Sequence, residues 1–250
     1  MSRLFTFGCS FTNYRWSTWA DCLAPEFDYF ENWGQSGGGN HYIFNSVMEA
    51  DQRHKFGAGD TVVVCWTSVM REDRYIKNRW VTLGNIMTTP IFTKEFITDA
   101  VCERGNLIRD LAFIKAVREI LNSKSDVTWR FLGICPIVQI DLLQPVRYQS
   151  NDLIDLYKDV IDSIEPSFID ILGHNFWNSN TEKRFCHLED NNTIDHHPTP
   201  EEHLTYLDAV LPGWVTKQET RVKITEESIY LNKDPRKTSR RPGMTRIARL

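Results

Sequence analysis

The chain has 250 residues, 41% hydrophobic and 25% charged, a composition typical of a globular protein with a substantial core. The longest apolar run, 62–66, is too short to cross a bilayer, and the first residues lack the hydrophobic stretch of a signal peptide, so we expect synthesis in the cytoplasm. The six cysteines form no C-x-x-C pair, which argues against a four-cysteine metal site and favours a reducing compartment.

The predicted elements alternate between strands and helices along the chain. In order they are strand 3–8, helix 16–23, strand 27–33, helix 42–56, strand 61–66, helix 99–121, strand 127–134, helix 153–164, strand 167–172 and helix 200–210. Thr199 and Pro200 are a typical N-cap and first-turn pair for the last of these helices. Residues 67–98 show no clear periodicity and are interpreted as an irregular excursion, and 174–194 as a polar loop.

Strands that alternate with helices pair in parallel through right-handed crossovers. The sequence therefore predicts a three-layer α/β/α sandwich around a parallel, flavodoxin-like sheet of about five strands. We expect one domain over residues 1–215 and a C-terminal extension over 216–250.

The net charge of −4 hides a basic end. Residues 233–250 contain seven Lys or Arg against Asp234, a net +6, so the first 232 residues carry −10. With Pro235, Pro242 and Gly243 and few apolar residues, this segment is interpreted as an extended tail. It is either a solvated end or an arm that binds an acidic partner, nucleic acid or a neighbouring subunit within a larger assembly.

Four segments with reactive or hydrogen-bonding side chains fall after predicted strands or just before the last helix. They are GCSF at 8–11, NWGQSGGGN at 32–40, WTS at 66–68 and DHHP at 195–198. Ligands of parallel sheets bind at the carboxyl ends of the strands. A serine, a glycine-rich turn, and an acid with a histidine should therefore meet at one edge of the sheet.

Together these segments resemble the blocks of the SGNH (GDSL-type) hydrolases, over about residues 3–212. The resemblance implies that Ser10 is the nucleophile, His197 the general base and Asp195 the acid. It also implies an oxyanion hole built from the Ser10 and Gly37 amides. The function implied is hydrolysis of a carboxylic ester, such as an acyl group on a glycan, with no cofactor and no metal ion.

The chain departs from the pattern of this family in three places. Cys9 replaces the aspartate of the G-D-S triplet. Ser68 stands where the third block has its oxyanion asparagine, and losing such a donor can cost about 3–4 kcal/mol in the transition state; Asn40 is a second candidate donor. Asp195 lies two residues before His197 where the family often has three, with Asp190 in reserve.

Each segment also has an alternative interpretation. Ser10 could cap a helix that starts near residue 11, and Cys9 could replace it as the nucleophile. The glycine-rich segment could be a flexible turn or a phosphate-binding loop. The histidines at 196, 197 and 203, with Asp195 and Glu201, could bind zinc, although they lack the H-E-x-x-H spacing.

A second function from a different class remains open. The weakened third block and the basic tail are compatible with a binding or structural protein that keeps the scaffold and has lost hydrolysis. The resemblance extends to SGNH-like proteins of bacteriophages, which implies either action on acylated cell-surface glycans or incorporation into the virion. Intact Ser10, Gly37, Asp195 and His197 favour the enzyme.

Overall fold

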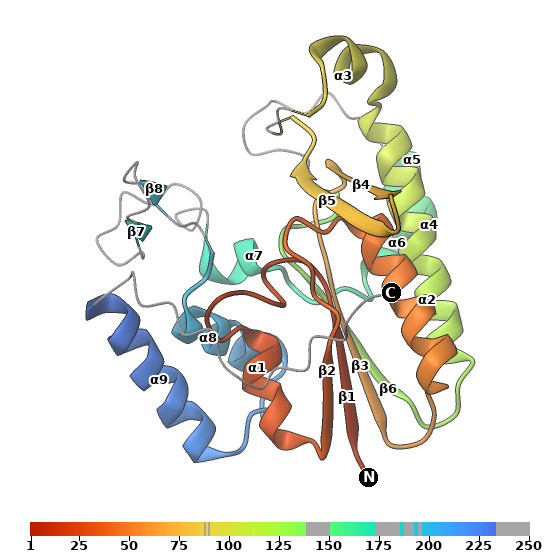
Figure 1. The fold of residues 1–250 in the computed structure, drawn as a ribbon. Coiled ribbons are helices and arrows are strands. Elements are labelled where there is room, and N and C mark those ends of the chain that lie inside the picture. Colours follow the sequence, from red (N-terminus) through yellow and green to blue (C-terminus); the bar gives the residue numbers. More distant parts are fainter. Residues whose placement is uncertain are drawn as a thin grey trace.

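The computed structural model describes residues 1–87, 89, 91–138, 151–173, 186–187, 193–194 and 197–233 (Figure 1). Its central sheet has the order β2-β1-β3-β6, and all three pairings are parallel. The strands are β1 (Arg3–Phe7), β2 (Tyr29–Asn32), β3 (Asp60–Trp66) and β6 (Thr128–Gly133). In the described part of the chain the sheet therefore has four strands, one fewer than expected.

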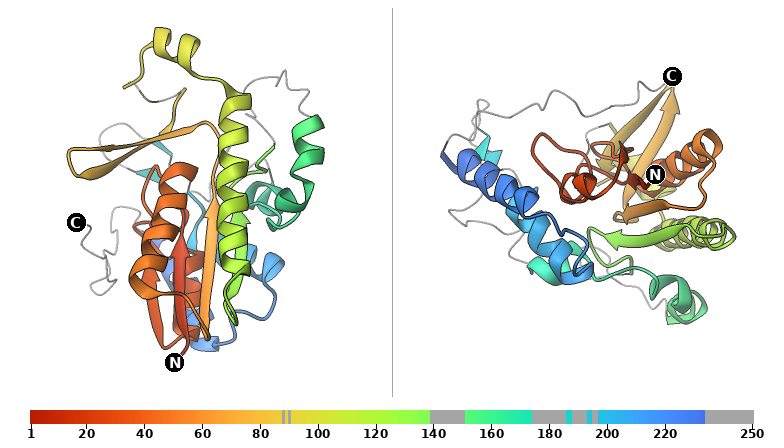
Figure 2. Two further views of the ribbon diagram at one scale, coloured as in Figure 1. Left: turned by 90° about the vertical axis from the view of Figure 1, so that its right-hand side faces the viewer. Right: turned by 90° about the horizontal axis from the view of Figure 1, so that it is seen from below.

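Helices cover both faces of the sheet because side chains alternate between the faces along each strand (Figures 1 and 2). Phe5, Val62 and Val64 point into one core cluster, with α2 (Asn40–His54) and α4 (Glu103–Asn122). Leu4 and Val63 point into the other, with α1 (Trp19–Leu23), α8 (Pro200–Val210) and α9 (Gln218–Lys233). The predicted three-layer α/β/α sandwich is confirmed.

The fifth predicted strand, 167–172, is a helix. Ser167 caps α7 (Phe168–Leu172): its hydroxyl accepts the Asp170 N–H, and the Asp170 carboxylate accepts the Ser167 N–H. This reciprocal capping box satisfies two N–H groups that a helix start leaves open, and it favours the helix over an extended segment. Thr199 and Glu202 form the same arrangement at α8, where the predicted helix is confirmed residue for residue.

Regular structure also replaces the irregular excursion predicted over 67–98. An antiparallel hairpin joins β4 (Arg71–Ile76) to β5 (Arg79–Asn85), and α3 (Lys94–Ala100) follows it. Lys77 and Asn78 form the two-residue turn, both with positive φ, as a hairpin of this length requires. The hairpin projects from the end of the sheet where β1 and β3 terminate (Figure 2).

The remaining elements are short. They are the 3-10 turn η1 (Ala24–Glu26), α5 (Asn151–Leu156), α6 (Lys158–Ile161), β7 (Cys186–His187) and β8 (Thr193–Ile194). Within the described residues, no helix is both long enough and apolar enough to cross a membrane.

The predicted extension 216–250 begins with a packed helix. Ile224 of α9 is buried in the second core cluster, and Leu231 packs against Trp16. The Glu227 carboxylate accepts the Ser17 N–H at 3.3 Å, and the Ser228 hydroxyl accepts the Glu201 N–H at 3.1 Å. Residues 234–250, with nearly all of the basic tail, lie outside the described part of the chain.

Candidate active site

Ser10 lies in a tight turn directly after β1. The Cys9 carbonyl accepts the N–H groups of Thr12 and Asn13 at 3.0 and 3.2 Å, which reverses the chain. Gly8 permits this turn, since a Cβ there would lie 2.1 Å from Thr12 Oγ1. The first helix begins only at Trp19, so Ser10 caps no helix.

His197 meets Ser10 across 187 residues of sequence. Its Nε2 lies 2.8 Å from the Ser10 Oγ, within the range of a proton-transferring hydrogen bond. The backbone that follows His197 is held in place, because Thr199 caps α8 and the Trp16 indole N–H donates to the Pro198 carbonyl at 2.7 Å. Ser10 is only 5% exposed and His197 is half-buried, so the contact is partly shielded from water.

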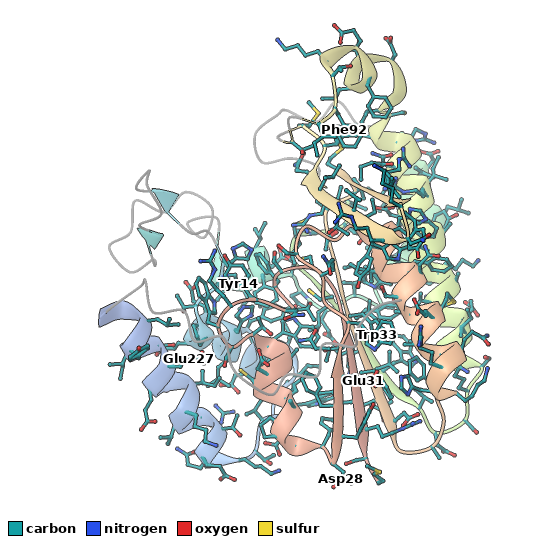
Figure 3. The ribbon with its side chains drawn as sticks, viewed as in Figure 1. Tyr14, Asp28, Glu31, Trp33, Phe92 and Glu227 are labelled. Atoms are coloured by element: carbon teal, nitrogen blue, oxygen red, sulfur yellow. The ribbon has the colours of Figure 1, made fainter. Side chains whose placement is uncertain are left out.

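Aromatic side chains surround the His197 ring. Tyr14 stacks on it, and Phe11 lies at a tilt with its ring centroid 5.6 Å away. In Figure 3, the labels Asp28, Glu31 and Trp33 follow β2 from just before its start to just after its end. Tyr14 lies toward that carboxyl end of the sheet. Behind them His203 is completely buried against Phe11 and Phe168. Burial, with a smaller contribution from the charge of His197, holds the pKa of His203 well below its usual value, which keeps that ring neutral.

The predicted acid, Asp195, and its reserve, Asp190, both lie outside the described residues, as does His196. Among the residues that are described, no three His, Cys, Asp or Glu side chains gather as a metal site would require.

The glycine-rich segment lies beside the serine turn. The Gln35 N–H donates to the Gly8 carbonyl at 3.0 Å, and the Asn13 amide donates to the Gly34 carbonyl at 3.0 Å. Gly37 has φ +73°, a conformation that glycine adopts without strain. In the described part of the chain, neither the Ser10 N–H nor the Gly37 N–H is taken up by a protein acceptor.

The two candidate side-chain donors differ. The Ser68 hydroxyl accepts the Met70 N–H at 3.2 Å, and its own hydrogen has no acceptor among the described residues. Asn40 is completely buried, and its amide donates to the Thr67 carbonyl at 2.9 Å and to Asp110 at 2.7 Å. Both of its hydrogens are therefore used within the core. The expectation that Asn40 leans into the site is corrected: this side chain fixes the end of β3.

Cys9 has no exposed surface and packs into the second core cluster. Its Sγ accepts the Phe11 N–H at 3.5 Å. The thiol therefore faces the core, while the neighbouring Ser10 hydroxyl faces His197 from the turn that follows β1.

Sequence reasoning missed several residues that shape this site. Tyr14 had no predicted role, Trp16 was predicted as an apolar position of the helix 16–23, and Asp73 fell in the irregular excursion. No local pattern distinguished Asp73, because its partners Gly39 and Tyr42 lie 34 and 31 residues away in sequence.

No family model matches the sequence, and no curated protein matches it. Solved structures give weak similarity. A member of the lipolytic protein G-D-S-L family from Veillonella parvula is 10% identical with a TM-score of 0.42, covering 84% of this chain and 97% of its own. The psychrotrophic esterase EstA from Pseudoalteromonas sp. is 9% identical with a TM-score of 0.43, covering 83% and 96%. An alpha/beta hydrolase enzyme from the metagenome of Lake Arreo, Spain, is 14% identical with a TM-score of 0.43, covering 86% and 97%.

Proposed function

We propose that this chain is a serine hydrolase that cleaves carboxylic esters, with Ser10 as the nucleophile and His197 as the general base. The observation that carries the proposal is the 2.8 Å contact between Ser10 Oγ and His197 Nε2 at the carboxyl end of β1. A serine hydroxyl is a weak nucleophile unless a base within hydrogen-bond reach can take its proton. This pair meets that requirement.

The reaction follows from this pair. Ser10 Oγ attacks the carbonyl carbon of the ester while its proton passes to His197 Nε2. The tetrahedral intermediate collapses when the alkoxide leaves with that proton, which leaves the acyl group on Ser10. Water then attacks the acyl-enzyme, again giving its proton to His197, and the acid is released with Ser10 restored.

The developing oxyanion needs donors that are already in position. The Ser10 and Gly37 amides are the candidates, and the Ser68 hydroxyl would supply a third hydrogen bond. Donors of this kind contribute on the order of 3–4 kcal/mol each to the transition state. Asp195 is proposed to orient the His197 ring through Nδ1, so that Nε2 is free to accept the proton.

The proposed substrate is an ester with a short acyl group, and acylated glycans are the candidate class. The half-buried Tyr14 ring beside His197 suits a neutral or sugar-like alcohol as well as an aliphatic one. A screen must choose among them.

The test is labelling of the intact chain with a fluorophosphonate probe, read by mass spectrometry. We expect one adduct on the wild type, mapped to Ser10, and none on Ser10→Ala or His197→Ala. Ser123→Ala and His54→Ala are matched controls, because these residues lie at the C-terminal ends of α4 and α2, at the opposite end of the sheet from Ser10, and they should label like the wild type. A folded wild type that takes no adduct would contradict the proposal and favour a binding protein on this scaffold.

A further inference from the structure

The β4–β5 hairpin holds the glycine-rich loop through consecutive hydrogen bonds. Three successive carbonyls of the loop each accept a donor from the hairpin. Thr82 Oγ1 donates to Ser36 at 2.6 Å, the Gly84 N–H to Gly37 at 3.0 Å and Arg71 Nη1 to Gly38 at 2.8 Å.

Asp73 of the same hairpin takes the next donors along the chain. Its carboxylate accepts the Gly39 N–H at 2.9 and 3.0 Å and the Tyr42 N–H at 2.9 Å. Gly39 is the N-cap of α2, and it carries no side chain that could cap the helix itself. The Asp73 carboxylate, on β4, thus satisfies the open N–H groups at the start of α2, where the helix dipole also favours negative charge.

Close packing supports the same conclusion. A Cβ on Gly37 would lie 2.6 Å from the Thr82 carbonyl, and a Cβ on Gly39 would lie 2.8 Å from both the Arg71 Cβ and an Asp73 carboxylate oxygen. Asp73 is 1% exposed, so these bonds form away from water, where they are strongest. Loop and hairpin therefore form one rigid unit beside Ser10.

We propose that the hairpin sets the position of the Gly37 amide as an oxyanion donor, and that Asp73 is the positioning residue on which this depends. The inference rests on the proposed hydrolase function. The inference gives the hairpin after β3 a role in the reaction. The segment 66–68 supplies only the Ser68 hydroxyl as a donor, and the hairpin that follows it fixes the position of the Gly37 N–H.

The hydrogen bonds from Gly39 and Tyr42 to Asp73, called the clamp below, lie at a distance from the proposed nucleophile and base. Asp73 contacts neither Ser10 nor His197 in the bonds described above, and its partners are backbone groups of residues 39 and 42. Its loss should therefore displace the oxyanion donor while leaving the serine–histidine pair in place. Errors of about 1 Å in such geometry can lower a rate by about 100-fold.

The experiment compares Asp73→Ala with Asp73→Asn, using p-nitrophenyl acetate hydrolysis and the second-order rate of fluorophosphonate labelling. We expect Asp73→Ala to lower kcat and the labelling rate by about 10- to 100-fold, with the pH at half-maximal rate unchanged. Asp73→Asn keeps one acceptor oxygen for the Tyr42 N–H, but its NH2 group replaces the oxygen that accepts the Gly39 N–H at 2.9 Å, so its rate should lie between those of Asp73→Ala and the wild type. Tyr75→Ala, at the exposed end of the same hairpin, is the control and should match the wild type.

Amide hydrogen exchange supplies a readout that needs no activity. In Asp73→Ala, peptides covering residues 36–42 should exchange faster, while peptides from the middle of α4 should not. A folded Asp73→Ala protein that labels at the wild-type rate, or that shows unchanged exchange over 36–42, would overturn the inference. If the wild type itself is neither labelled nor active, the proposed function fails, and with it the role of Asp73 in positioning an oxyanion donor. Faster exchange would then report a purely structural clamp.

Discussion

The ring of Tyr14 lies flat against the imidazole of His197, with the ring centroids 3.8 Å apart and the planes 17° apart. Trp16 packs edge-on against the same tyrosine at 4.6 Å, and the Arg15 guanidinium lies 5.4 Å from its ring centroid. The proposed base is thus held by a stack that begins four residues after Ser10. One short loop therefore contacts both members of the proposed pair, Ser10 and His197.

Replacing Tyr14 by Leu should slow fluorophosphonate labelling of Ser10 by about tenfold, because an aromatic stack of this kind contributes about 0.5–1.5 kcal/mol beyond its buried area. Tyr14→Phe keeps the ring and should label at nearly the wild-type rate. Labelling at a fixed probe concentration, quenched at several times and read by mass spectrometry, measures the rate for each variant. Equal rates for Tyr14→Leu and the wild type would show that the stack does not align His197.

Replacing Gly37 by Ala should destabilise the protein as well as inactivate it. The left-handed backbone at φ +73° costs a residue with a Cβ about 1–2 kcal/mol, and the new methyl would meet the Thr82 carbonyl at 2.6 Å. We expect a lower melting temperature and slower hydrolysis. Gly57→Ala is the control, since a Cβ there meets only the Lys55 carbonyl, at 3.8 Å. An unchanged melting curve for Gly37→Ala would contradict the tight fit between loop and hairpin.

The buried carboxyl of Asp110 should make stability fall as pH rises. Burial raises its pKa from 3.8 to about 6, although Arg109 and Asn40 both donate to it. Because the folded-state pKa lies above the unfolded one, folding favours the protonated form. This contribution is therefore complete below about pH 4 and is lost as pH rises through 6, by on the order of 3 kcal/mol.

Denaturant unfolding at several pH values between 4 and 7.5 measures that loss. Asp110→Asn cannot titrate, so the difference between the two free energies of unfolding should narrow as pH rises. The variant should be less stable overall at low pH, because its amide presents hydrogens to one of the two existing donors. Parallel curves for variant and wild type would mean that Asp110 does not titrate in this range.

Removing the cap of α8 should weaken the support of His197. The Thr199 hydroxyl accepts the Glu202 N–H at 3.2 Å, and Glu202 accepts the Thr199 N–H at 2.8 Å. Thr199→Ala should cost about 1 kcal/mol and lower the melting temperature by about 2–4 °C, whereas Thr199→Ser should restore most of it. Calorimetry decides this, and a Ser variant as unstable as the Ala variant would argue against the hydroxyl bond.

Local chemistry in the sequence predicted much of this fold. The β-branched run at 61–66 and the Thr199–Pro200 start were sufficient for β3 and α8. At 167–172 the apolar run was interpreted as a strand, although Ser167 and Asp170 carry the spacing of a capping box. Helix and strand cannot be told apart by periodicity over so few residues, and the cap was the better guide.

Long-range pairings explain what the sequence could not predict. The turn at Lys77 and Asn78 has no glycine, so the hairpin carried no strong local signal. Asn40 looked available for the site because its partner, Asp110, lies 70 residues away in sequence. Asp73 and Gly39 are likewise 34 residues apart, and nothing near either residue points to the other.

The packing of α9 has a practical consequence for anyone who shortens this protein. Leu231 supports Trp16, which in turn holds Pro198, and Glu227, on α9 in Figure 3, bonds the backbone of Ser17. Deleting this helix to remove the basic residues beyond it would loosen the segments that bear Ser10 and His197 together. A truncation intended to probe the tail must stop after Lys233, and loss of activity in any shorter version would say nothing about the tail itself.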